Sequence, residues 1–123
     1  MIAFDADVLS ELFRGSPQFV DRANSVPSDQ HSIPVIVVEE ILRGRLNMIR
    51  RAEAGRAGIG IERAYDLFQE TVRVISQFQV LAYTAAAEQL YQDWRRQKLR
   101  LGTHDLRIAA MCIAHSAKLI SGN

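Results

Sequence analysis

The chain has 123 residues, of which 48% are hydrophobic and 24% are charged, and its formal net charge is +1. These values predict one globular domain rather than two, and the near-neutral charge excludes a strong overall field toward nucleic acid. Cys112 is the only cysteine, so an internal disulfide is excluded and a reducing compartment is expected. The N-terminus lacks the pattern of a signal peptide, and no apolar stretch approaches the ~18 residues of a membrane span. We therefore expect a soluble, cytoplasmic protein.

The predicted elements alternate between short strands and helices. Apolar runs with polar stops predict strands at residues 1–4, 32–34, 79–82 and 118–121. Apolar residues at helical spacing predict helices at residues 7–14, 17–23, 35–54, 61–76, 84–98 and 104–115. This order predicts an α/β fold with three layers, in which helices cover both faces of a mostly parallel sheet of four or five short strands.

Sheets of this kind bind ligands at the carboxyl ends of their strands. Asp5 and Asp7 come just after the first predicted strand, and Ser121 to Asn123 end the chain after the last one. Two groups of basic residues lie elsewhere, from Arg43 to Arg63 and from Arg95 to Arg100. Each group alone is most simply a solvated helix face, although local basic faces of this kind can hold phosphates.

Five acids lie near predicted helix starts or strand ends, and each has an ordinary structural explanation when taken singly. Asp7 fits a helix N-cap, and Asp105 in a first turn favours the helix dipole. Glu39 and Glu40 are neighbours on a helix, about 100° apart, so at least one of them can face water. Asp5 is harder to explain, because it ends a buried strand and a carboxylate there needs a partner.

Asp5, Glu40 and Asp105 lie at the edges of three buried elements and could converge on one cleft. Two carboxylates ~4 Å apart repel each other by about 4 kcal/mol at an effective dielectric typical of a protein surface. A dication would remove that cost, and oxygen ligands suit Mg²⁺ or Mn²⁺ better than zinc. His104 and His115 are too far apart along one helix to share a metal, so the histidines are expected to be surface or capping residues.

The segments around these acids resemble, in order, the motifs of PIN-domain nucleases. FDADVLSELFRG is similar to the first motif, a hydrophobic strand ending in Asp before a short helix. VEEILRGR is similar to the second, with Ile41 in place of the usual Leu, and the step to Gly44 selects Glu40 rather than Glu39. LRLGTHDLRIAAMCIA resembles the third motif, and LISGN resembles the start of the last.

This resemblance implies a metal-dependent ribonuclease of the VapC-like kind, the toxin of a toxin–antitoxin pair. It implies that Asp5, Glu40 and Asp105 are catalytic and hold Mg²⁺ or Mn²⁺. Residues expected to support them are Asp7, Thr103, Ser121 and Asn123. The arginine-rich helix pair from Arg43 to Arg63 is expected to guide RNA or to form the surface that the antitoxin contacts. The residues expected to bind RNA are Arg43, Arg45, Arg50 and Arg51. An antitoxin and a second copy of the chain, in a homodimer or a higher oligomer, are the expected protein partners.

One departure from the family pattern and one competing resemblance keep alternatives open. The family's last motif places a fourth acid a few residues after the Asn, so we expect the single domain, residues 1–123, to be cut short before that acid or to lack it. A PIN-like module that only binds a partner therefore remains an alternative. IAFDADV is also similar to the start of haloacid-dehalogenase-like phosphatases, with Asp5 as nucleophile and Asp7 as acid/base, although that alternative gives Glu40 and Asp105 no role.

Overall fold

A computed structural model describes residues 1–121 of the chain. The strands are β1 (Ile2–Phe4), β2 (His31–Pro34), β3 (Gln79–Leu81) and β4 (Lys118–Ile120). The helices are α1 (Ala6–Phe13), α2 (Pro17–Asn24), the short 3₁₀ helix η1 (Ser28–Gln30), α3 (Val35–Glu53), α4 (Ile61–Ile75), α5 (Ala85–Arg96) and α6 (Thr103–Ala114). Within these residues, no helix is long and apolar enough to cross a membrane.

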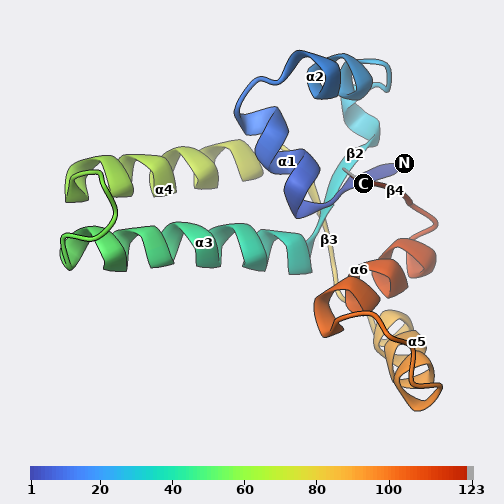
Figure 1. Cartoon of the computed structure of the whole chain (residues 1–123). Helices are drawn as coiled ribbons and strands as arrows, with labels where there is room; N and C mark the ends of the chain where they lie inside the picture. Colours follow the sequence, from blue (N-terminus) through green and yellow to red (C-terminus); the bar gives the residue numbers. More distant parts are fainter. Residues whose placement is uncertain (122–123) are drawn as a thin grey trace.

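The strands form one parallel sheet, and within residues 1–121 it has four strands in the order β3-β2-β1-β4. The predicted α/β fold with a parallel sheet is confirmed. In Figure 1, α1 and α2 lie on one side of the strands and α5 and α6 on the other, while the α3–α4 hairpin extends away from the sheet. Because all strands are parallel, their carboxyl ends meet at one edge, directly before α1, α3 and α5.

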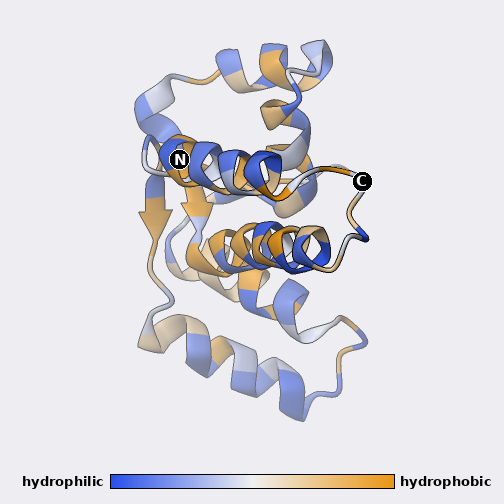
Figure 2. Ribbon diagram, turned by 90° about the vertical axis from the view of Figure 1, so that its left-hand side faces the viewer, coloured by the Kyte–Doolittle hydropathy of each residue, from blue (hydrophilic) through white to orange (hydrophobic). Residues whose placement is uncertain are grey.

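One continuous core surrounds the sheet. It includes Phe4 of β1, Leu9 of α1, Ile33 of β2 and Met111 of α6, each 0% or 1% exposed. Strand residues buried on both faces explain the uninterrupted apolar run IAF in β1. Figure 2 shows hydrophobic positions on the strands and on one side of the helices, with hydrophilic positions on the other side.

Two glycines follow the ends of helices, where a turn requires a positive φ. Gly15 follows α1 with φ 73° and Gly55 follows α3 with φ 70°, a left-handed conformation that glycine adopts at little cost. The mostly apolar run at residues 106–114 predicts a helix buried on nearly all sides, but only the inner face of α6 is buried. Leu106 and Cys112 are buried, but Ile113 is 59% exposed because α6 covers the sheet as an outer layer.

Candidate metal and RNA site

Asp5 stands at the carboxyl end of β1, at the edge where the parallel strands end. Its main-chain N–H donates to the carbonyl of Ile120 at 3.2 Å, which places it beside the end of β4. Its carboxylate Oδ1 accepts from the main-chain N–H of Val8 at 2.9 Å. The N-cap of α1 is therefore Asp5, and the prediction that Asp7 caps this helix is wrong. Both acids fit the sequence pattern, but the helix begins one residue earlier than predicted, which leaves Asp7 exposed in the first turn.

Glu40 lies in α3, six positions after β2 ends, and meets a residue of α6. His104 Nδ1 lies 3.0 Å from Glu40 Oε1, and His104 Nε2 lies 3.6 Å from Glu39 Oε1. The second oxygen of Glu39 lies 2.7 Å from Arg43 Nη2. The four side chains form a chain of contacts that ties the start of α6 to α3. We call it the His104 cluster: Glu39, Glu40, Arg43 and His104.

Sequence reasoning missed the role of His104, which it treated as a surface or capping residue. The periodicity of apolar residues does not encode a contact between α3 and α6, which are distant in sequence. The position of His104 directly before Asp105, a candidate ligand, was the one signal that it could lie near the site. The other histidines contact main-chain carbonyls: His31 Nε2 lies 2.9 Å from the oxygen of Ala23, and His115 Nε2 lies 2.8 Å from that of Ala82. These contacts are structural, as predicted.

Asp105 follows His104 in the first turn of α6 and is exposed. Thr103 begins the same helix, and Ser121 is half-buried just after β4. The position predicted for Asn123 lies outside the described residues. The first turn of α6 therefore presents Asp105 beside the histidine that holds Glu40.

The three candidate ligands lie on elements that contact one another, because α3 packs against both α1 and α6. Their carboxylate oxygens are the donors that Mg²⁺ and Mn²⁺ prefer. Within residues 1–121, however, no three His, Cys, Asp or Glu side chains lie close enough to hold a metal ion. Two of the carboxylates each have one oxygen engaged, Asp5 Oδ1 by the Val8 N–H and Glu40 Oε1 by His104, and the second oxygen of each can serve a metal. The donor chemistry fits a dication, and binding requires these side chains to turn toward one another.

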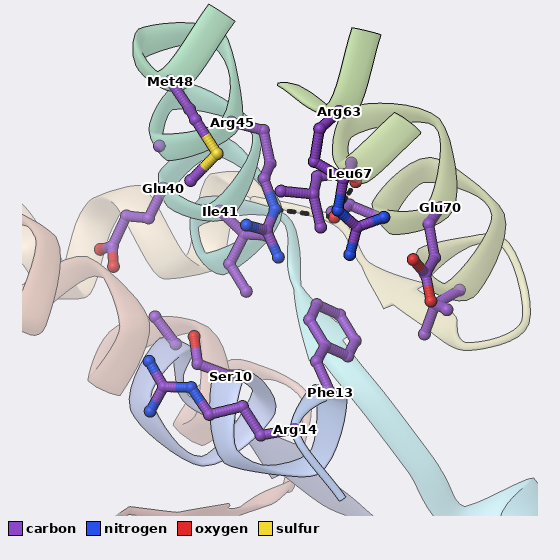
Figure 3. Close-up of a pocket in the computed structure, with 14 residues that line it drawn as sticks. Ser10, Phe13, Arg14, Glu40, Ile41, Arg45, Met48, Arg63, Leu67 and Glu70 are labelled. Atoms are coloured by element: carbon purple, nitrogen blue, oxygen red, sulfur yellow. Dashed lines mark hydrogen bonds between the residues drawn. The ribbon is translucent and has the colours of Figure 1, made fainter. Parts of the chain in front are cut away.

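A pocket of about 610 Å³ opens between α1, α3 and α4, and Glu40 forms part of its wall. Figure 3 shows Arg45 of α3 and Arg63 of α4 extending toward one another, with the ring of Phe13 pointing in from α1. Arg14 also lines the pocket but pairs with Glu11 at 2.7 Å. We call this the arginine pocket.

The arginines predicted to guide RNA occupy different surroundings. Arg43 belongs to the His104 cluster, and Arg45 lines the arginine pocket. Arg50 and Arg51 are exposed farther along α3. The sequence showed Arg63 only as part of a basic segment. Arg63 faces Arg45 only because α4 folds back along α3, and the local sequence does not show this arrangement.

The PIN domain family model matches residues 2–123. The chain belongs to the PIN domain family. The match covers Asp5, Glu40 and Asp105 together, and the resemblance predicted from the sequence is confirmed. Among curated proteins, none is significantly similar to this PIN domain.

Several solved structures share its fold. A toxin–antitoxin complex from Klebsiella pneumoniae has 22% identity and a TM-score of 0.74, covering 100% of this chain and 87% of that one. FitAcB from Neisseria gonorrhoeae has 20% identity and a TM-score of 0.79, covering 100% and 88%. VapBC2 from Rickettsia felis, bound to a promoter DNA fragment, has 18% identity and a TM-score of 0.74, covering 100% and 88%. At these identities, the similarity establishes the fold of this PIN domain.

Proposed function

We propose that this PIN domain is a metal-dependent endoribonuclease and the toxin of a toxin–antitoxin pair. The observation that carries the proposal is the family match over residues 2–123, together with carboxylates on three elements that contact one another. PIN domains are typically nucleases that use divalent ions. The similar structures described as toxin–antitoxin complexes support the toxin role and an antitoxin as partner.

In this proposal Asp5, Glu40 and Asp105 hold one or two Mg²⁺ or Mn²⁺ ions. A bound dication supplies a Lewis acid for phosphate oxygens and an activated water at neutral pH. The chain's own contribution is to orient the ligands: β1 and the α1 cap fix Asp5, and His104 holds one oxygen of Glu40. The exposed Asp105 completes the donor set from α6, and Asp7, Thr103, Ser121 and Asn123 support it.

RNA, an antitoxin and a second copy of the chain are the proposed partners, and the cytoplasm is the proposed location. A phosphatase with Asp5 as nucleophile receives no support from the family match or the similar structures. It would be detected as a trapped aspartyl-phosphate analogue on Asp5. A catalytically silent binding module would instead bind its partner and would not cleave RNA in the presence of any divalent metal ion.

The test is cleavage of end-labelled RNA by the purified chain with Mn²⁺, Mg²⁺ or chelator. We expect cleavage with either ion, none with chelator, and a loss of about 100-fold or more in Asp5→Asn. Asparagine also accepts at a helix N-cap, so this substitution removes the charge while keeping the bond from Val8. Asp29→Asn, in η1, is the matched control and should cleave normally. Equal cleavage by both variants contradicts the proposal.

A further inference from the structure

The arginine pocket is lined by three arginines, Arg14, Arg45 and Arg63, and by two carboxylates, those of Glu40 and Glu70. Within residues 1–121, neither Arg45 nor Arg63 takes part in an ion pair, whereas Arg14 and Arg43 each pair with a glutamate. Both unpaired groups extend into the same space between α3 and α4 (Figure 3). Like charges that face one another across a cavity favour an anionic occupant.

Arg45 is fixed in the direction of the pocket. Its Nε donates to Thr71 Oγ1 at 2.9 Å, and the Thr71 hydroxyl donates to the carbonyl of Leu67 at 2.7 Å. Thr71 is only 3% exposed, so this support is buried in the seam between α3 and α4. The bond engages Nε and leaves the two terminal nitrogens of Arg45 for a ligand.

Apolar and aromatic residues form another part of the lining. Phe13, Ile41 and Leu67 line the pocket, and the ring of Phe13 points into it (Figure 3). Planar guanidinium groups match the geometry of a phosphate, and an aromatic ring provides a stacking surface for a base. A nucleotide offers both an anion and a flat ring system, so it fits this combination.

We propose that the arginine pocket binds a nucleotide of the RNA next to the cleaved bond, with a phosphate between Arg45 and Arg63 and a base against Phe13. The inference rests on the proposed function for its choice of RNA, because Glu40 forms part of the pocket wall. An RNA strand that passes the candidate carboxylates would enter this pocket next, because Glu40 belongs to both the candidate metal site and the pocket wall.

The test measures RNA binding without cleavage, as fluorescence anisotropy of a short single-stranded RNA of mixed sequence in chelator, over a series of salt concentrations. We expect Arg63→Met and Arg45→Met each to weaken binding about tenfold at low salt and to lower the salt slope by about one. Phe13→Leu keeps an apolar side chain and should weaken binding about fivefold through lost stacking.

Arg73→Met is the matched control, because Arg73 is exposed on the same helix, α4, and lies outside the pocket. It should change the affinity by less than about twofold. Arg63 is exposed on α4, so its substitution remains informative even if loss of the Arg45–Thr71 bond unfolds the chain. A loss in Arg73→Met as large as that in Arg63→Met, or no loss in either, overturns the inference.

Two further results separate this inference from its alternatives. If a polyglutamate peptide displaces the RNA probe as well as unlabelled RNA does, the pocket is a groove for an acidic protein segment and the inference is wrong. If the pocket variants lose RNA binding but the wild type cleaves no RNA with Mn²⁺, the nucleotide site stands and the proposed ribonuclease activity fails. Cleavage by the wild type with unaffected binding in all pocket variants supports the ribonuclease and overturns the nucleotide site.

Discussion

The sheet region and the α3–α4 hairpin are held together in different ways. Around the sheet, one core cluster joins the strands to α1, α5 and α6, and it takes in Val37 and Ile75 at the ends of α3 and α4 nearest the sheet. Along the hairpin, Ile49 and Ala64 are buried but lie outside that cluster, and Tyr65 and Val72 are 53% and 46% exposed. The hairpin is thus stabilised mainly by a narrow seam between its two helices. This difference teaches that stability is concentrated in the sheet region, whereas the hairpin offers charged surface for binding.

The largest expected effect tests this contrast with a pair of leucines. Leu9 in α1 is 0% exposed and Leu46 in α3 is 44% exposed, and both are helical, so alanine has similar helix propensity at each. We expect Leu9→Ala to lower the free energy of unfolding by about 2–5 kcal/mol, because it leaves a cavity. Leu46→Ala should change it by about 0.5 kcal/mol or less. Urea denaturation measures both, and equal losses would contradict the division of the molecule into two regions.

Sequence patterns predicted the sheet region well for a physical reason. Apolar runs and helical spacing directly encode burial, and the glycines at positions 15 and 55 encode helix ends, so most elements were predicted within a few residues. Choosing between Asp5 and Asp7 as the cap of α1 failed, because the two acids differ only in where the first helical turn begins. Side-chain patterns do not fix that point.

Contacts between helices could not be predicted in the same way. The His104 cluster depends on how α6 lies against α3, and the arginine pocket depends on how α4 folds back to bring Arg63 opposite Arg45. These arrangements follow from packing over the whole chain rather than from local periodicity. The positions of the candidate acids at the edges of buried elements, together with the family resemblance, selected Asp5, Glu40 and Asp105. Neither predicted that His104 contacts Glu40.

A smaller effect should distinguish metal binding, which involves His104, from RNA binding in the arginine pocket. His104→Ala removes the partner of Glu40, so this carboxylate gains freedom that binding of a metal must restrict. We expect the affinity for Mn²⁺, measured by titration calorimetry, to fall about tenfold, as for other residues that orient metal ligands. RNA binding in chelator should not change, because His104 does not line the arginine pocket.

Two variants control this experiment. His104→Gln keeps a hydrogen-bond donor that can reach Glu40 and should recover part of the Mn²⁺ affinity. His115→Ala, at the other end of α6, removes a contact with the carbonyl of Ala82 and should leave Mn²⁺ affinity unchanged. If His104→Ala binds Mn²⁺ as well as the wild type, or better, His104 does not position Glu40.

The smallest expected effect concerns how the free energy of unfolding depends on pH in the acidic range, through Glu88 of α5. Gln92 Nε2 donates to Glu88 at 3.1 Å and the Tyr83 hydroxyl donates to it at 2.7 Å, and these bonds lower the pKa of the Glu88 carboxyl. A lowered pKa stabilises the folded chain at pH values above the ordinary pKa of glutamate. That contribution is lost as the pH falls through the lowered value.

Tyr83→Phe removes one donor, so the pKa of Glu88 should rise toward its ordinary value and part of this pH dependence should disappear. NMR titration of the Glu88 side chain measures the shift. Tyr65→Phe is the matched change on the hairpin, where Tyr65 is 53% exposed, and should leave the pKa of Glu88 unaltered. If Tyr83→Phe leaves that pKa unaltered as well, the hydroxyl does not stabilise the ionised carboxylate. Gln92, the larger cause, then accounts for the lowered pKa without a contribution from Tyr83.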